Sequence, residues 1–206
     1  MPDLAFTQKE NTMSKLTTFV TAITLCAAAT ISYAETWTLD ASVSKISFGS
    51  IKNDSIGESH TFNDINGAVN NDGAVTLKIG LPSVQTMIDV RNERMVAQVF
   101  KNAVAATISA QVDMAELNKL SVGEATTVES EGTLSLLGTD TALDAALFVM
   151  RLSENRVLVT TDGMIMLDLE EAGLSEGINT LQELASLDSI TRVSPVTMRL
   201  IFDTQP

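Results

Sequence analysis

Apolar and polar residues alternate one by one along most of the chain after residue 44. In the stretch AVTLKIGL, Val75, Leu77 and Ile79 fall on one side, while Thr76 and Lys78 fall on the other. A period of two predicts a β-strand with one dry face and one wet face, which is typical of antiparallel sheet. The same alternation predicts strands in the segments SKISFGSI (44–51), ATISAQVDM (106–114), TTVESEGTLSLLG (126–138) and PVTMRLIFD (195–203).

Two segments replace this alternation with helical spacing. In TMIDVRNERMVAQVFKN (86–102), apolar residues recur at helical spacing behind Thr86, which stands where an N-cap is expected, with Asp89 at the third helical position. In GLSEGINTLQELASLDS (173–189), the residues Ile178, Leu181 and Ala185 recur in the same way. Each segment predicts one short helix.

We therefore predict an all-β domain of about eight antiparallel strands with two short helices. Eight such strands with a continuous dry face can close on themselves, which removes exposed sheet edges. A closed barrel of this size has an interior just wide enough for one small or elongated ligand. The alternative is a sandwich of two sheets, in which the dry faces would fill the interior themselves.

The first 34 residues have the pattern of an export signal. A single positive charge at Lys15 precedes an apolar run over 16–31, and the segment closes on small residues at Ala34. Residues 1–34 are thus predicted to be an upstream extension and a cleaved signal peptide, which leaves one exported domain over 35–206. The alternative, a membrane anchor, is disfavoured because the run is short and rich in alanine and threonine.

Charge and residue content exclude several classes of function. The chain carries 13 Lys and Arg against 26 Asp and Glu, a net charge of −13, which argues against binding to nucleic acid. The one cysteine, Cys26, lies in the predicted signal, so disulfides and thiol chemistry are not expected. His60 is the only histidine, and no P-loop, dinucleotide fingerprint or G-x-S-x-G motif is present. We expect no enzyme, no metal site and no cofactor beyond a bound lipid or quinone.

The predicted dry face indicates what the interior would accept. Its members are all uncharged, so a polar ligand would cost several kcal/mol, whereas a hydrocarbon chain gains about 0.8 kcal/mol per buried CH₂. If the barrel is hollow, we expect an apolar ligand; the alternative is that these side chains pack on one another. The predicted lining residues are Ile46, Phe48, Phe62, Val75, Leu77, Ile79, Leu81, Ile108, Val112, Leu134, Leu136, Met198, Leu200 and Phe202.

A polar cluster follows the strand that ends at Leu81. Thr86, Arg91 and Arg94 are candidates to contact a ligand's head group, since an arginine and a phosphate can form a bidentate pair. The alternative, which we favour, is that the arginines pair with Asp89, Glu93 or nearby loop carboxylates and stabilise the fold. For His60 we likewise expect a hydrogen bond within a turn rather than a role as ligand or base.

Four motifs in order resemble a known family, the YceI-like polyisoprenoid-binding proteins. WTLD and SKISF (37–48) are similar to the family's W-x-L-D … S-x-I-x-F opening. GESHTF with ING (57–67) matches a G…F…G stretch. SVQT, RNERM and Phe100 (83–100) resemble S-I-x-T … R-D-x-x-L … F-F, and GTLSLLG (132–138) resembles G-x-L-T-I-x-G. The resemblance covers nearly all of the predicted mature chain.

The resemblance implies a lipocalin-like antiparallel barrel in the periplasm that encloses the isoprenoid tail of a lipid or a quinone-like molecule. We expect a binding or carrier protein whose partner is an amphiphilic lipid. Two alternatives stay open: an accessory protein of an envelope or quinone-linked redox complex, and an enzyme in which Asp89, Glu93 or His60 acts on a lipid head group. A membrane-complex partner and a homodimer are also left open.

Overall fold

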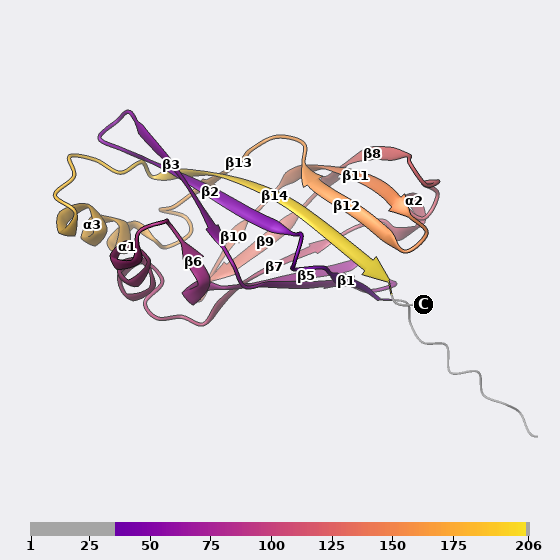
Figure 1. Cartoon of the computed structure of the whole chain (residues 1–206), viewed down its shortest axis with the longest axis horizontal. Helices are drawn as coiled ribbons and strands as arrows, with labels where there is room; N and C mark the ends of the chain where they lie inside the picture. The colour runs from indigo at the N-terminus through magenta and orange to yellow at the C-terminus, as the bar shows by residue number, and fades with distance from the viewer. Residues whose placement is uncertain (1–35, 205–206) are drawn as a thin grey trace, which may run out of the picture. The chain divides into compact units, whose positions relative to one another are not determined.

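The computed structural model describes residues 36–204, which belong to one compact unit that spans Ala34–Pro206. The predicted signal segment over 1–34 lies outside the described residues. Fourteen strands and a few short helices make up the described part (Figure 1). The strands are β1 (Trp37–Leu39), β2 (Lys45–Lys52), β3 (Ile56–Phe62), β4 (Ile65–Val69), β5 (Ala74–Gly80), β6 (Val84–Gln85), β7 (Ala105–Gln111), β8 (Ala125–Ser130), β9 (Gly132–Leu136), β10 (Thr139–Ala142), β11 (Ala145–Ser153), β12 (Arg156–Thr161), β13 (Ile165–Asp168) and β14 (Val193–Thr204).

All fourteen strands join one antiparallel sheet. The main path runs β10-β9-β7-β5-β4-β1-β14-β12-β11-β8, while β13 and the β2-β3-β6 branch also attach to β14. The long strand β14 organises the sheet, because its first half pairs with β13 and β2 and its second half pairs with β1 and β12. A single sheet of this kind also differs from the alternative of two stacked sheets.

The predicted all-β antiparallel class is confirmed, but the predicted strand number and closure are wrong. The sheet has fourteen strands rather than about eight, and its end strands β8 and β10 do not pair with each other, so the described sheet is not closed. Segment 126–138 shows the reason. It alternates without a break, yet it forms two strands separated at Glu131: β8 pairs with β11, whereas β9 pairs with β7 and β10. The alternation of side chains along a segment does not reveal with which other strands that segment will pair.

Both predicted helices are present, and a third short one accompanies them. Helix α1 (Asp89–Arg94) continues into the π-helical turn η2 (Met95–Val99), and α3 (Ser175–Leu184) packs against that turn. Helix α2 (Met114–Leu117) and the 3₁₀ turn η1 (Leu81–Ser83) are shorter. Among residues 36–204, no helix has the length and apolar character needed to cross a membrane.

The predicted capping role of Thr86 is wrong. Ile88 occupies the N-cap position of α1, and no side chain caps that helix. The Thr86 hydroxyl instead donates to Asn92 Oδ1 at 2.7 Å.

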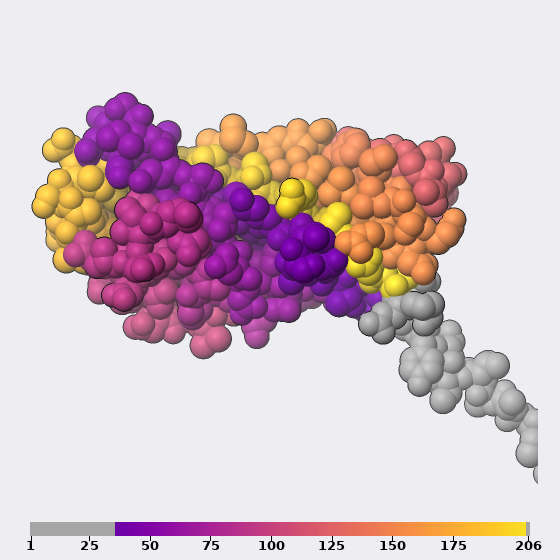
Figure 2. Space-filling view, viewed as in Figure 1, coloured from indigo at the N-terminus to yellow at the C-terminus, as the bar shows by residue number. Residues whose placement is uncertain are grey.

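The two ends of the folded unit differ in what surrounds them. Helices α1 and α3 lie together at one end, beside the turn between β2 and β3, whereas α2 lies at the other end (Figure 1). The space-filling view shows the same three segments gathered at the first end (Figure 2). Hydrogen bonds tie them together, since Asp188, just after α3, donates its backbone N–H to Asn53 in the β2–β3 turn. Between the two ends, a continuous cluster of buried apolar side chains occupies the inner face of the sheet.

Candidate binding site in the interior of the sheet

Two cavities lie along the inner face of the sheet. The larger has a volume of about 400 Å³ and lies toward α1 and α3; the smaller has a volume of about 110 Å³ and lies toward α2. Ile108 of β7 and Leu143 line both, so the two hollows adjoin. Strand β5 runs along both of them, with Val75 and Leu77 in the smaller cavity and Ile79 in the larger.

All fourteen predicted lining residues face one of these cavities. The larger is lined by Ile46, Phe48, Phe62, Ile79, Leu81, Leu134 and Leu136, the smaller by Val75, Leu77, Val112, Met198, Leu200 and Phe202, and both by Ile108. Alternate residues of a strand point to the same side, so the period of two identified all of them except Phe62, which lies outside the predicted strands. Their part in ligand binding stays a prediction.

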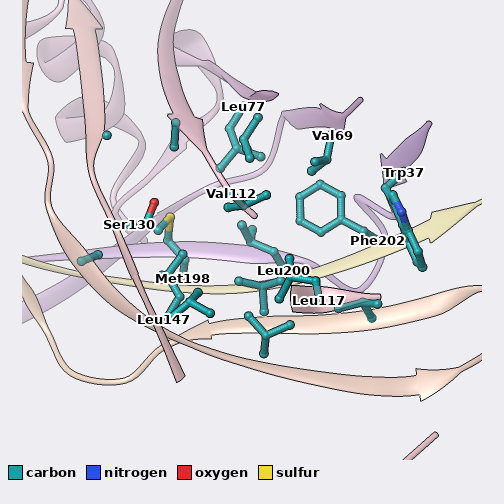
Figure 3. A pocket seen from close by; sticks show the side chains of 18 of the residues that line it. Trp37, Val69, Leu77, Val112, Leu117, Ser130, Leu147, Met198, Leu200 and Phe202 are labelled. Carbon is teal, nitrogen blue, oxygen red and sulfur yellow. The ribbon is translucent and has the colours of Figure 1, made fainter. Parts of the chain in front are cut away.

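The smaller cavity is almost wholly apolar, and Trp37, Leu117 and Arg151 are among the residues that line it. Figure 3 shows side chains from Trp37, Leu117, Leu200 and other residues converging on it. Arg151 is buried, with its guanidinium 5.5 Å from the centre of the Trp37 ring. It donates to the carbonyl oxygens of Glu154 and Leu117, and within the described chain it forms no ion pair. Arg151 therefore links α2 to the β11–β12 turn beside the cavity.

The larger cavity has apolar walls and one polar end. The predicted lining set had no ionisable member, but Lys52, Glu58, His60, Arg91 and Arg94 also line this cavity. The prediction of a wholly uncharged lining is therefore wrong. Glu58 and His60 are two positions apart in β3, so they point to the same side of the sheet as the residues facing them on β2.

Glu58 is the centre of this polar end. It pairs with Lys52 at 3.1 Å and with Arg91 at 2.5 Å, and Arg91 also donates to the carbonyl oxygen of Thr86 at 2.6 Å. Burial opposes ionisation of Glu58, but the hydrogen bond from Lys52 and the charge of Arg91 outweigh it and hold the pKa of Glu58 below its ordinary value. The carboxylate therefore joins β2, β3 and α1 at the cavity wall.

His60 has one nitrogen engaged and one without a protein partner. The side chain is only 3% exposed; Nε2 lies 3.1 Å from the Ser50 hydroxyl, whereas Nδ1 is buried and unpaired. Burial, followed by the positive charge of Arg91, lowers the pKa of His60, so the ring is neutral near pH 7. The expected hydrogen bond is present, but it is made from within strand β3 and not within a turn.

The three predicted head-group residues differ in position. Arg91 and Arg94 line the larger cavity, whereas Thr86 does not and is bound to Asn92. Arg91 pairs with Glu58 rather than with Asp89 or Glu93, and Arg94 donates to the carbonyl oxygen of Leu184. Three cations face one carboxylate around this cavity, which leaves an excess of two positive charges in a strongly acidic chain.

Sequence reasoning missed the part of the cavity wall that does not come from alternating strands. Helix α3, the π-helical turn and the segments that follow this turn and β13 contribute several residues: Met95, Val99, Phe100, Leu169, Leu174, Ile178 and Leu181. Helical spacing had marked Ile178 and Leu181 as apolar. It could not show which surface they would cover.

Comparison with known proteins identifies two similar solved structures. No family profile and no curated sequence matches the chain. A polyisoprenoid binding domain from Saccharophagus degradans, implicated in plant cell wall breakdown, is 36% identical with a TM-score of 0.80, over 82% of this chain and 98% of that one. BcnA from Burkholderia cenocepacia is 11% identical with a TM-score of 0.58, over 79% of this chain and 98% of that one. At that identity, the second match shows likeness of fold alone.

Proposed function

The chain belongs to the YceI-like family of polyisoprenoid-binding proteins, and on that basis we propose that it binds the isoprenoid tail of a lipid, or another long-chain amphiphile, inside the sheet. One observation carries the proposal: two adjoining cavities share Ile108 and Leu143, and they are apolar toward α2 and polar toward α1. Such a hollow matches a molecule with a long hydrocarbon tail and a single polar end.

The energetics favour a hydrocarbon occupant. The run from Val75 to Leu81 covers seven residues, or roughly 20 Å of extended chain between the first and the last, and every second side chain along it faces a cavity. Burial of ten CH₂-sized groups along such a path would contribute about 8 kcal/mol before the entropic costs of binding are subtracted. A polar ligand would find no hydrogen-bond partners along most of these walls.

The polar end gives the ligand a direction. The tail would extend toward Trp37, while the head group would lie near His60, Arg91 and Arg94. The guanidinium groups of Arg91 and Arg94 are hydrogen-bond donors, so a head group with an acceptor oxygen fits them, such as a quinone carbonyl or a phosphate. In this proposal Thr86 does not touch the ligand but positions Arg91 through its carbonyl oxygen.

We propose that the protein works as a carrier or store in the periplasm and is not an enzyme. The export signal predicted from residues 1–34 supports the location, and the similarity to a binding domain supports binding rather than catalysis. A role as partner of a quinone-linked membrane complex, and self-association, stay predictions.

Extraction of the purified protein with organic solvent, followed by mass spectrometry, tests the proposal. We expect one long-chain amphiphile per chain, and reloading of the emptied protein by an isoprenoid alcohol or quinone. A protein that yields no lipid and cannot be reloaded would contradict it. The exposed variant V122T, at the α2 end of the unit, should retain the lipid and serves as the control.

A further inference from the structure

Exposed aliphatic residues surround the opening of the larger cavity. Ile88 and Val90 line the cavity, yet they are 46% and 51% exposed, so they mark the place where it reaches the surface. Further exposed aliphatic side chains belong to the β2–β3 hairpin and the end of α3, and these segments gather with α1 at the same end of the unit (Figure 2). We call this set the apolar rim; its members are Ile56, Met87, Ile88, Val90 and Leu184.

The rim is built from segments that the fold ties together. Arg91 of α1 binds Glu58 of β3, and Arg94 binds the carbonyl oxygen of Leu184 in α3. Lys52 forms an isolated β-bridge with Ile190, in the segment that follows α3. Side chains far apart in the sequence are thus held around one opening.

Met87 is the most exposed member and has an unfavourable backbone conformation. Its side chain is 84% exposed and its φ is +65°, in the left-handed region that residues other than glycine rarely adopt. The Met87 N–H donates to Gln85 Oε1 at 2.6 Å, which helps to hold this conformation. Local strain of this kind often accompanies functional surfaces, and here it directs a long apolar side chain into solvent.

We propose that the apolar rim docks on an electrically neutral lipid surface, so that a tail passes between the bilayer and the cavity without crossing water. This inference rests on the proposed function. A lipid surface fits because the rim is aliphatic and continuous with the apolar cavity. Five residues are also far fewer than the roughly 20–30 per partner of a stable protein interface. Weak, reversible binding through a few inserted side chains suits a carrier.

The charges around the rim favour neutral over anionic lipid. Five exposed carboxylates belong to the same segments: Asp54, Asp89, Glu93, Glu183 and Asp188. The cations of these segments, Lys52, Arg91 and Arg94, line the cavity. An anionic surface would repel the outer carboxylates, and salt would reduce that repulsion.

Flotation with phosphatidylcholine vesicles tests the docking. Met87 and Leu184 belong to the rim but do not line the cavity, so M87Q/L184Q removes apolar surface without changing the lipid site. We expect the vesicle partition coefficient to fall about tenfold. V122T/L152Q changes two exposed aliphatic residues at the α2 end, and it should bind as the wild type does. Phosphatidylglycerol in the vesicles should weaken binding, and added salt should restore it.

All proteins in this experiment carry the same N-terminus, so any vesicle binding by residues before 36 is the same in each of them. Unchanged binding of M87Q/L184Q, an equal loss in V122T/L152Q, or no binding by the wild type would each overturn the docking. Sedimentation that shows M87Q/L184Q breaking a dimer would assign the rim to a second copy instead. The lipid content of the same samples distinguishes the docking proposal from the proposed function. M87Q/L184Q should keep its bound lipid even though it docks less. If the wild type docks through the rim but contains no lipid, only the proposed function is overturned.

Discussion

At the scale of single residues, the polar end of the larger cavity depends on a neutral His60 beside the Glu58–Arg91 pair. The folded chain resists protonation of this imidazole, because burial and then Arg91 lower its pKa. The unfolded chain takes up the proton near the ordinary value of 6.5. Below that pH the unfolded state therefore binds more protons, and the stability of the folded state must fall.

The first prediction concerns this pH dependence. Between pH 7.5 and 5.5 the free energy of unfolding should decrease in the wild type, by at most about 1.4 kcal/mol per pH unit from this one group. His60→Gln removes the titrating group and can still hydrogen-bond Ser50. The free energy of unfolding of this variant should therefore depend less on pH. Urea unfolding at each pH measures this. Glu58 titrates in a lower window, since its stabilising charge is lost only as pH falls below 4.5.

Parallel pH curves for the wild type and His60→Gln would show that His60 is protonated as readily in the folded chain as in the unfolded one. Glu58→Gln, measured over the same pH range, is the control because it alters the neighbouring charge and leaves the histidine in place.

The second prediction concerns Arg151 at the α2 end of the unit. Arg151→Met removes the donor to the carbonyl oxygens of Glu154 and Leu117 and the cation above Trp37, so we expect a loss of about 1–3 kcal/mol in stability. The emission of Trp37, the only tryptophan, should also change. Chemical unfolding followed by tryptophan fluorescence measures both. Arg199→Met, at an exposed position, should change neither by as much.

At the scale of secondary-structure elements, the contact between α3 and the π-helical turn closes the wall of the larger cavity. Gly177 of α3 makes the contact possible, because a Cβ at this position would lie 2.5 Å from Val99 Cα and 2.6 Å from the carbonyl oxygen of Gln98. Both neighbours are backbone atoms, so they cannot move aside cheaply. Glycine has a poor helix propensity, but at this position it allows α3 to pack closely against the turn.

The third prediction follows from this contact. Gly177→Ala would stabilise an isolated helix, but here it should destabilise the protein by about 1–3 kcal/mol, because α3 must move away from the turn. Thermal unfolding measures the change. Glu183→Ala, at an exposed position of the same helix, should leave stability nearly unchanged. A more stable Gly177→Ala protein would show that the two segments are not packed this closely.

At the scale of the whole molecule, the two cavities act as one binding site only if a tail can pass between them at Ile108 and Leu143. Ile108 projects from β7 into this junction. Its neighbours across the sheet, Leu77 and Leu134, line different cavities, which places Ile108 at the boundary.

The fourth prediction is that Ile108→Phe shortens the longest chain the protein can hold. The larger ring should obstruct the junction and confine the tail to the larger cavity. Mass spectrometry after loading with isoprenoid alcohols of increasing length measures the limit, and circular dichroism verifies folding. An unchanged chain-length limit in a folded Ile108→Phe protein would mean that the smaller cavity takes no part in binding.

The sequence by itself determined which side of each predicted strand faces the interior. Alternate residues of a strand point to opposite sides of a sheet, so Val75, Leu77 and Ile79 could be assigned to one face without knowing their neighbours. The family resemblance, the antiparallel class and two of the three α-helices were likewise readable, because each depends on local pattern.

Only the tertiary structure decided how many strands form, that the sheet stays open, and where the charged groups lie. The pairing of Arg91 with Glu58 joins residues 33 positions apart, and the division of segment 126–138 depends on partners elsewhere in the chain. Neither the ion pair nor the division into two strands can be predicted from the local alternation of apolar and polar residues. The physical reason is that a strand's period reports the direction of its side chains, whereas its pairing and its ion partners depend on contacts made only when distant segments meet.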